Sequence, residues 1–173
     1  MKKVKFPFWT GFLLVILLWY GGRYFYFQPT FDVREQAPDF EATLLNGVPF
    51  KLKDVRGNHV LVHFWGSWCG PCRQENPALT AIYNQYQEKK FTIVGIAIEK
   101  NSNNWRQAIE RDQLNYPYHI LDQTSNFKFF DAPLSKLYGV KQLPSNFLLD
   151  ERGTIIAVNL TPPQLEAHLK EKL

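Results

Sequence analysis

The sequence contains few cysteines and lacks a basic cluster in its main part, and each absence excludes a class of protein. Two of the 173 residues are cysteine, which is too few for a small disulfide-stapled domain or for a four-cysteine zinc site. Four of the 20 Lys and Arg residues precede Asp32, so the remaining chain holds as many basic as acidic groups, 16 of each. No run of Lys or Arg longer than a pair occurs in that part, which argues against nucleic acid as a partner.

A long apolar run lies near the start of the chain. Residues 6–22 carry no charged side chain, and as a helix they would span about 25 Å, close to the roughly 30 Å hydrocarbon core of a bilayer. Lysines precede the run, an arginine follows it, and aromatic residues flank both ends as in membrane-interface belts. These flanking residues are Lys2, Lys3, Lys5, Arg23, Phe6, Phe8, Trp9, Tyr20, Tyr24 and Tyr26. We expect a cytoplasmic tail and transmembrane signal-anchor over residues 1–27, then a polar linker over 28–36.

A cleaved signal peptide and a soluble amphipathic helix are the other interpretations of this segment. Cleavage after Gly21 or Gly22 would put Trp19 or Tyr20 where a cleavage site carries a small residue, so the uncleaved anchor is favoured. Because basic residues favour the cytoplasmic side of a membrane, we expect the N-terminus inside. The rest of the chain then lies outside the cytoplasm, in an oxidising compartment.

Alternating strand and helix patterns over residues 37–173 predict an α/β domain with a mixed sheet. Asn46-Gly47 is a hairpin turn signal. Two nearly continuous apolar runs have the length and character of buried central strands, and Ser102 and Thr161 are expected helix N-caps. The expected strands are 39–45, 48–52, 59–65, 91–98, 117–121, 144–150 and 154–158, and the expected helices are 70–89, 101–114, 134–138 and 162–172.

Both cysteines lie in one Cys-x-x-Cys motif, directly after a predicted buried strand and at the start of a predicted helix. The amides and partial positive charge of a helix N-terminus stabilise a thiolate, which is the form that attacks disulfides. Cys69 should therefore be the exposed nucleophile, with Cys72 one turn further as the resolving thiol within disulfide reach. Gly70 leaves room for a partner chain, and Pro71 suits the first helical turn.

Two other uses of this motif remain open. The cysteines could form half of a metal site, which would need further ligands from His59, His63, His119 or His168. They could also form a purely structural disulfide, although so small a ring constrains the unfolded chain very little.

The stretch FWGSWCGPCRQENP, from Phe64 to Pro77, resembles the active site of thioredoxin-fold proteins. More narrowly, residues 37–173 are similar to the membrane-anchored TlpA/ResA/CcmG group of thiol-disulfide oxidoreductases, which are AhpC/TSA-redoxin-like. APDFEATLLNGVPFKL resembles the N-terminal hairpin of this group, and YGVKQLPSNFLLDERG resembles its cis-proline stretch. The resemblance implies a thioredoxin-like fold with an N-terminal β-hairpin and a central βα insertion over 91–121, after one N-terminal transmembrane helix.

The resemblance also implies roles for particular residues. It implies a cis peptide bond between Leu143 and Pro144, with Pro144 beside the cysteines and the backbone of Leu143 pairing with a bound client chain. Glu75 matches an acid of the group that transfers protons and raises thiol pKa values; a solvated helix glutamate is the alternative. Trp68 should frame the site.

His63 and Glu99 are further candidates for tuning the cysteines. His63 occupies a position at which many thioredoxins carry a buried acid, so it could shuttle a proton from Cys72, or it could be a hydrogen-bonded core histidine. Glu99 ends the second buried strand, from which an acid could face the site. Phe127, Phe129 and Phe130 could plug the core or dock a partner.

The expected function is thiol-disulfide oxidoreduction through a Cys69–Cys72 disulfide on the periplasmic side of a bacterial cytoplasmic membrane. The resemblance implies reduction of client protein disulfides, apocytochrome c among them, with electrons from a membrane thiol carrier and with no metal or organic cofactor. One alternative is an anchored copper-binding module, although related copper chaperones space their cysteines one residue further apart. The other is a thiol peroxidase, but Gly66 stands where peroxidases carry Thr or Ser.

Overall fold

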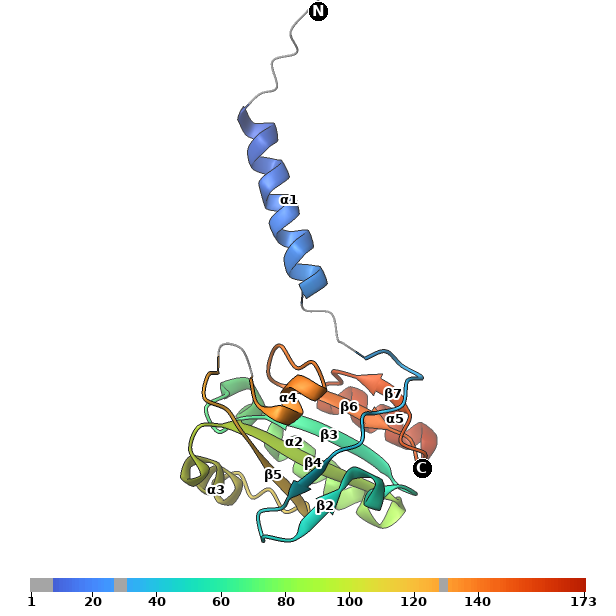
Figure 1. The fold of residues 1–173 in the computed structure, drawn as a ribbon. Coiled ribbons are helices and arrows are strands. Elements are labelled where there is room, and N and C mark those ends of the chain that lie inside the picture. Colours follow the sequence, from blue (N-terminus) through green and yellow to red (C-terminus); the bar gives the residue numbers. More distant parts are fainter. Residues whose placement is uncertain (1–7, 27–30, 128–130) are drawn as a thin grey trace, which may run out of the picture.

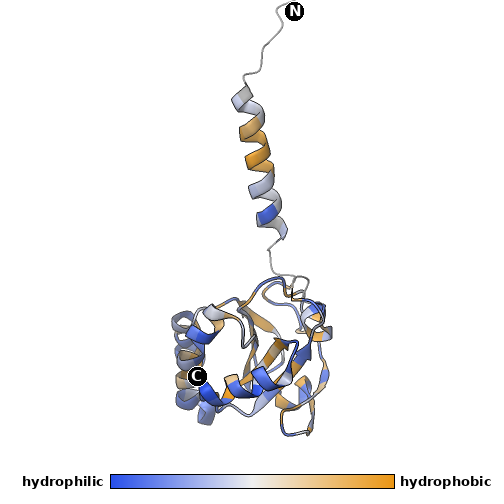
Figure 2. Cartoon of the chain, turned by 90° about the vertical axis from the view of Figure 1, so that its left-hand side faces the viewer, coloured by the Kyte–Doolittle hydropathy of each residue, from blue (hydrophilic) through white to orange (hydrophobic). Residues whose placement is uncertain are grey.

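The computed structural model describes residues 8–26, 31–127 and 131–173. Helix α1 (Phe8–Tyr26) extends away from the α/β domain formed by the later residues (Figure 1). Its most hydrophobic turns lie near its middle (Figure 2). Among the described residues, no helix combines the length and the hydropathy that a membrane crossing requires.

A five-stranded sheet forms the centre of the domain, in the order β5-β4-β3-β6-β7. Strands β3 (His59–Trp65), β4 (Phe91–Glu99) and β5 (Tyr118–Gln123) are parallel, whereas β6 (Ser145–Leu149) and β7 (Ile155–Val158) are antiparallel to their neighbours. Every residue of β3 and β4 is buried. The mixed sheet and its two central apolar strands are therefore confirmed.

Helices and a hairpin cover the two faces of this sheet (Figure 1). Side chains of α2 (Gly70–Tyr86), α3 (Ser102–Arg111) and α5 (Pro162–Lys172) share one buried cluster with Leu61 and Trp65. The other cluster contains Val60, Val62 and Phe64, together with side chains from α4 (Pro133–Leu137) and the N-terminal hairpin. Successive residues of β3 thus alternate between the faces, as a strand requires.

The expected hairpin is present but shorter than its two sequence segments. Strands β1 (Glu41–Thr43) and β2 (Pro49–Lys51) pair antiparallel, and Gly47 has a φ of +83°, a conformation that favours glycine. The 3₁₀ turn Leu52–Val55 (η1) follows β2, and the turn Gln87–Lys89 (η2) ends the α2 segment.

Several expected element boundaries were wrong, among them the end of helix α3, which lies at Arg111 and not at Leu114. Helix α3 is capped by Asn101, not Ser102, because the Asn101 side-chain oxygen accepts a hydrogen bond of 2.8 Å from the amide of Asn103. Strand β5 runs two residues further than expected because its pairing with β4 continues to Gln123. Helix α4 begins at Pro133, since the Asp122 carboxylate accepts hydrogen bonds from the first amides of that helix.

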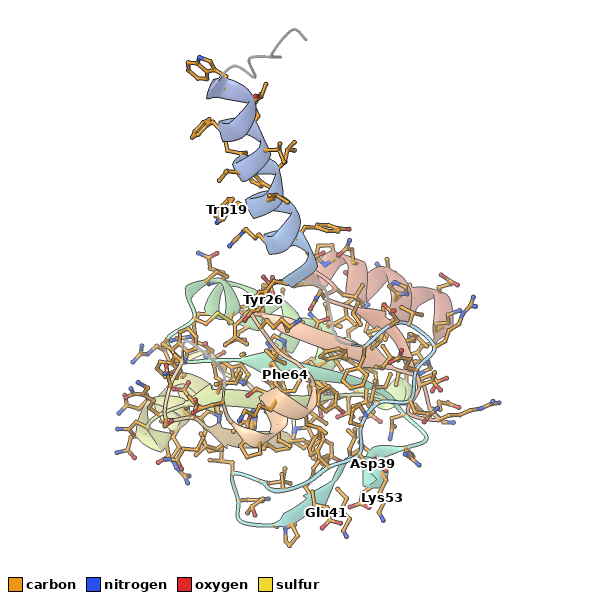
Figure 3. The ribbon with its side chains drawn as sticks, turned by 45° about the horizontal axis from the view of Figure 1, so that its top comes forward. Trp19, Tyr26, Asp39, Glu41, Lys53 and Phe64 are labelled. Carbon is orange, nitrogen blue, oxygen red and sulfur yellow. A yellow bond between two sulfur atoms is a disulfide. The ribbon has the colours of Figure 1, made fainter. Side chains whose placement is uncertain are left out.

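An aromatic cluster joins distant parts of the chain on the hairpin side of the sheet. The Tyr138 ring lies 5.3 Å from Phe64 and 5.2 Å from Phe147, centroid to centroid. Phe64 lies within the domain in Figure 3, while Trp19 projects from α1. The Tyr138 hydroxyl donates a 2.8 Å hydrogen bond to the carbonyl of Pro38, so this ring ties the start of the domain to its second half.

We expect Tyr138→Phe to lower the free energy of unfolding by about 1 kcal/mol, because the carbonyl of Pro38 loses its donor while the ring packing stays. Urea unfolding of the full chain in detergent measures this change. Tyr83→Phe, at a half-exposed position, is the matched control and should change stability less. Equal effects of the two variants would contradict the role of the Tyr138 hydroxyl.

Candidate active site

The two cysteines form a disulfide at the N-terminus of α2, with their Cα atoms 5.3 Å apart. Cys69 is the N-cap of the helix and is 5% exposed, whereas Cys72 in the first turn is fully buried. The Cys69 sulfur accepts a hydrogen bond of 3.3 Å from the Cys72 amide. An approaching partner therefore meets Cys69 first, and a thiolate at Cys69 is stabilised by the helix terminus.

The residues between the cysteines leave the outer side of the site open. A Cβ atom added at Gly70 would have no neighbour within 4 Å, and Pro71 is exposed in the first helical turn. The surface at Cys69 can therefore accept another polypeptide at close range.

The peptide bond between Leu143 and Pro144 is cis, as the resemblance implied. Strand β6 begins immediately after Pro144, and its first residue, Ser145, pairs with Phe64 near the end of β3. The Cys-x-x-Cys motif follows the same end of β3. The fold thus brings Leu143 and Pro144 to the edge of the sheet from which Cys69 emerges.

The end of β4 holds the loop that precedes Cys69. The Glu99 carboxylate, whose residue is 2% exposed, accepts a hydrogen bond from the amide of Ser67. The Trp68 indole donates a hydrogen bond of 2.8 Å to the carbonyl of Ile98. A Cβ atom at Gly66 would lie only 2.7 Å from the Trp68 indole nitrogen, so this close approach requires glycine. Burial raises the pKa of the Glu99 carboxyl, and its hydrogen bonds from Ser67 oppose that rise.

Sequence reasoning missed an ion pair that holds the same loop from the other side. The Arg73 guanidinium binds both carboxylate oxygens of Asp112, which also accepts a 2.7 Å hydrogen bond from the Asn76 amide. Arg73 donates a further hydrogen bond of 3.4 Å to the carbonyl of Ser67. Ser67 is thereby bound at its amide by Glu99 and at its carbonyl by Arg73. The available signal was a basic residue directly after Cys72, but nothing local points to Asp112.

Glu75 lies on α2, three residues beyond Cys72, and is half-buried. Burial raises the pKa of its carboxyl, so this group holds a proton at higher pH than an exposed glutamate does. Glu75 and Glu99 thus belong to different elements, the active-site helix and the end of β4.

His63 is fully buried, and neither of its ring nitrogens has a hydrogen-bond partner among the described residues. His63 is therefore a core histidine, but the expected hydrogen bonds to its ring nitrogens are absent among the described residues. Burial lowers the pKa of the imidazole to about 4, so the ring is neutral near pH 7. Leu61 and Trp65, its neighbours along β3 on the same face, belong to the cluster that contains both cysteines.

Trp68 forms an aromatic stack at the edge of the site. It is 44% exposed, and its ring centroid lies 4.5 Å from that of Phe127 at an interplanar angle of 36°. The Lys100 ammonium lies 4.9 Å from the Phe127 ring centroid. The partner of Trp68 thus comes from the loop after β5; Phe129 and Phe130 lie outside the described residues.

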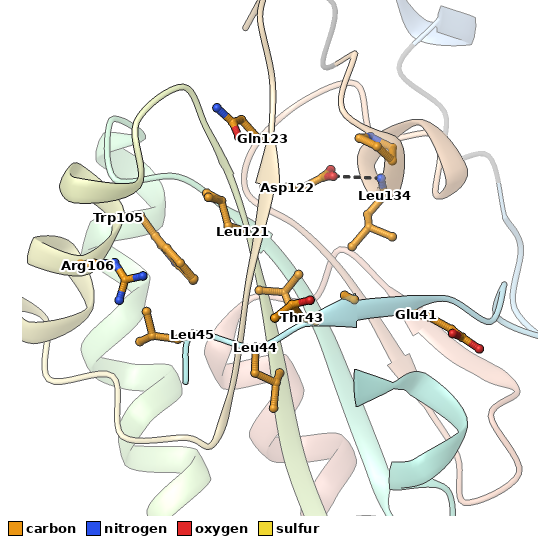
Figure 4. Close-up of a pocket in the computed structure, with 13 residues that line it drawn as sticks. Glu41, Thr43, Leu44, Leu45, Trp105, Arg106, Leu121, Asp122, Gln123 and Leu134 are labelled. Atoms are coloured by element: carbon orange, nitrogen blue, oxygen red, sulfur yellow. Dashed lines mark hydrogen bonds between the residues drawn. The ribbon is translucent and has the colours of Figure 1, made fainter. Parts of the chain in front are cut away.

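A pocket of about 540 Å³ lies elsewhere, along the outer edge of β5 between the hairpin, α3 and α4 (Figure 4). Trp105, Leu121 and Leu134 contribute to its lining, and none of the predicted site residues does. Figure 4 shows the bond from the Leu134 amide to the Asp122 carboxylate, which is 3.0 Å long and caps α4. Asp122 therefore serves to cap the N-terminus of α4.

Curated relatives of the chain cover nearly its whole length. The ResA thiol-disulfide oxidoreductase of Bacillus thuringiensis is 31% identical, in an alignment covering 99% of this chain and 98% of that protein. The thioredoxin-like protein YneN of Bacillus subtilis is 30% identical over 92% of this chain and 95% of its own length. The AhpC/TSA family model matches residues 33–158.

Solved structures of similar proteins share the fold. The thioredoxin domain of a thiol-disulfide oxidoreductase from Bacteroides vulgatus aligns with a TM-score of 0.73 and 29% identity, covering 83% of this chain and 99% of that one. A thiol-disulfide oxidoreductase from Bacteroides fragilis aligns with a TM-score of 0.71 and 28% identity, covering 80% of this chain and all of its own. The thioredoxin-like fold is therefore confirmed.

We expect His63→Leu to make stability less sensitive to acid. The unfolded chain protonates His63 near pH 6.5 and the folded chain only near pH 4, so above pH 6.5 the ring is neutral in both states and its protonation costs no stability. As the pH falls toward 4, the free energy of unfolding falls by on the order of 3 kcal/mol, because the unfolded chain takes up the proton first. Urea unfolding at several pH values measures the slope, and His168→Leu on α5 is the control. An unchanged slope in His63→Leu would count against this origin of acid sensitivity.

We expect Asp112→Asn to lower the free energy of unfolding by about 2 kcal/mol, because it leaves the half-buried Arg73 without its charged partner. The matched control is Glu41→Gln, which breaks the exposed pair with Lys51 and should cost less than Asp112→Asn because water screens that pair. Chemical unfolding of the full chain compares them; a larger loss for Glu41→Gln would refute the ranking.

Proposed function

Because the chain belongs to the AhpC/TSA family and is a thiol-disulfide oxidoreductase, we propose that it reduces disulfides of client proteins outside the cytoplasm. The observation that carries this proposal is the arrangement of the two sulfurs. Cys69 lies at the helix N-terminus on the open side, and Cys72 lies fully buried behind it. This arrangement favours attack by Cys69 on an external disulfide and a later attack by Cys72 on the resulting bond.

The proposed reaction conserves electrons between the two proteins. The Cys69 thiolate attacks one sulfur of a client disulfide, which forms a mixed disulfide and releases the first client thiolate. The Cys72 thiol then loses its proton and attacks the Cys69 sulfur, which releases the second client thiolate. The client gains two electrons, and the Cys69–Cys72 disulfide forms in the oxidised enzyme.

The client chain is proposed to bind beside Leu143 and Pro144. The position of the cis bond next to the start of β6 and the open space at Gly70 support this site. The backbone of Leu143 would pair with the client in the manner of an added strand, and Trp68 would bound the site on its exposed side.

Three titratable residues are proposed to control protons at the sulfurs. Glu75 transfers protons and raises thiol pKa values, which its half-buried place one turn beyond Cys72 supports. His63, a buried neutral base on the face of β3 whose Leu61 and Trp65 pack in the cluster with Cys72, takes the proton of Cys72. Glu99 acts on Cys69 through the loop that it holds at Ser67.

Membrane anchoring by residues 1–27, followed by a linker over 28–36 and the catalytic domain over 37–173, is also part of the proposal. The uncharged run 6–22, the lysines before it and the aromatic residues at both ends support a single span with the N-terminus inside. The domain would then act on the periplasmic side of a bacterial cytoplasmic membrane. Electrons would come from a membrane thiol carrier, and apocytochrome c is the proposed client.

Trapping tests the mechanism. Cys72→Ala should leave Cys69 joined to clients as mixed disulfides, because no resolving thiol remains. Non-reducing electrophoresis and mass spectrometry of proteins captured from intact bacterial cells identify these adducts. Cys69→Ala is the matched control and should yield at least about tenfold fewer adducts because its remaining thiol is buried.

Two results would contradict the proposal. Equal trapping by the two variants would show that Cys69 is not the nucleophile. Failure of Cys72→Ala to capture clients in cells and to form a mixed disulfide with oxidised glutathione in solution would exclude the mechanism itself.

A further inference from the structure

Gly95 on β4 separates two buried histidines in the sheet. It pairs with His63 on β3 and with His119 on β5. Paired residues of neighbouring strands direct their side chains to the same face. The absence of a side chain at Gly95 therefore leaves a space between the two imidazoles, beneath α2.

The Tyr116 ring fills this space. A Cβ atom on Gly95 would lie 2.8 Å from a ring carbon of Tyr116 and 2.9 Å from its hydroxyl oxygen. The ring stacks on His119 with centroids 4.4 Å apart. The Tyr116 hydroxyl thus lies over Gly95, the residue that pairs with His63 on the neighbouring strand. Tyr116 and Cys72 also belong to the same buried cluster.

The polar atoms at this place are costly for stability. Both ring nitrogens of His63 and the hydroxyl of Tyr116 are buried without hydrogen-bond partners in the described part of the chain. Such groups destabilise the folded state, and Phe in place of Tyr116 would fill the same space without that cost. Packing accounts for the Tyr116 ring but not for its hydroxyl.

Asn146 and His119 already make hydrogen bonds, although the Nδ1 atom of His119 has no partner among the described residues. Asn146, its partner on β6, donates 2.8 Å to the carbonyl of Leu160 and accepts 2.9 Å from the amide of Leu160. His119 is bonded through its Nε2 atom to the carbonyl of Leu114 at 3.1 Å. The Tyr116 hydroxyl and the Asn76 side-chain oxygen are buried acceptors that have no partner in the described part of the chain, and the hydroxyl is the one placed over Gly95, the strand neighbour of His63.

We propose that Tyr116 is a positioning residue for the resolving step, in which its hydroxyl oxygen accepts a hydrogen bond from the His63 imidazolium. This inference rests on the proposed transfer of the Cys72 proton to His63. The Cys72 thiol gives its proton to one ring nitrogen, and the other ring N–H donates to Tyr116. The Cys72 thiolate attacks the Cys69 sulfur, which breaks the bond from Cys69 to the client sulfur and releases the client thiolate. The proton leaves His63 for solvent after the disulfide has formed.

The charges around the pair are compatible with this role. Burial, and secondarily the negative charge of Asp112, raise the pKa of the Tyr116 hydroxyl, so it stays protonated and neutral. Arg73 balances the charge of Asp112. Strand pairing places Gly95 of β4 and Asn146 of β6 beside His63, with His119 of β5 beyond Gly95. Helix α2, which packs on this face, carries the titratable groups Cys72 and Glu75, and the charge of Asp112 acts on Tyr116.

Tyr116→Phe in the full chain tests the proposal, since Phe keeps the ring over Gly95 and removes only the hydroxyl. The reduced protein, in detergent, is mixed with oxidised glutathione, and samples are quenched with acid at successive times. Mass spectrometry then measures the amount of mixed disulfide at Cys69 in each sample. We expect its closure by Cys72 to slow by about tenfold near neutral pH, the size of one lost charge-assisted hydrogen bond. The pH profile of closure should move to higher pH, while stability stays equal or rises.

Tyr83→Phe is the matched control, because that ring is 6.2 Å from Tyr116 and half-exposed; it should leave closure unchanged. In a His63→Asn background, Tyr116→Phe should have no further effect on the rate. An unchanged pH profile in Tyr116→Phe, or an additive loss in the double variant, would overturn the inference. If the reduced wild-type chain forms neither a mixed disulfide nor the Cys69–Cys72 disulfide on reaction with oxidised glutathione, the proposed function fails instead.

Discussion

The complete burial of β3 between two layers of side chains is the constraint on which the rest of the structure depends. Its alternating residues contribute to both hydrophobic clusters, so the strand has one possible register in the sheet. The chain leaves this strand at Trp65 and turns into α2 at Cys69. The position of the Cys69 sulfur is thereby fixed by the packing of the central strand.

The loop between β3 and α2 is short, and hydrogen bonds from neighbouring elements hold it in place. Glu99 binds the amide of Ser67 and Arg73 binds its carbonyl, while Trp68 is bonded to the end of β4. These contacts come from the next strand and from the helix itself. A change in the packing of β4 or α3 would therefore reach Cys69 through this loop, without touching either sulfur.

The buried face beneath the disulfide has an unusual polar content for a core. His63, Tyr116 and Asn76 all carry buried polar atoms that lack partners among the described residues, and each lowers stability by the cost of an unmet hydrogen bond. They lie on the α2 side of the sheet, where both sulfurs are packed, whereas the opposite face is closed by the Tyr138 aromatic cluster. In the proposed mechanism the buried sulfur exchanges protons inside a core without bulk water, and these polar side chains are the groups that would carry them.

The sequence by itself determined the elements whose signals are local. The bounds of β3 followed from a continuous apolar run, and the place of Cys69 at a helix N-terminus followed from the residues that surround it. Only the tertiary structure decided which distant groups meet there: Asp112 with Arg73, Glu99 with Ser67, and Tyr116 over Gly95. Periodicity and capping act within a few residues along the chain, whereas these contacts join residues 21 to 39 positions apart and depend on strand register and crossover geometry.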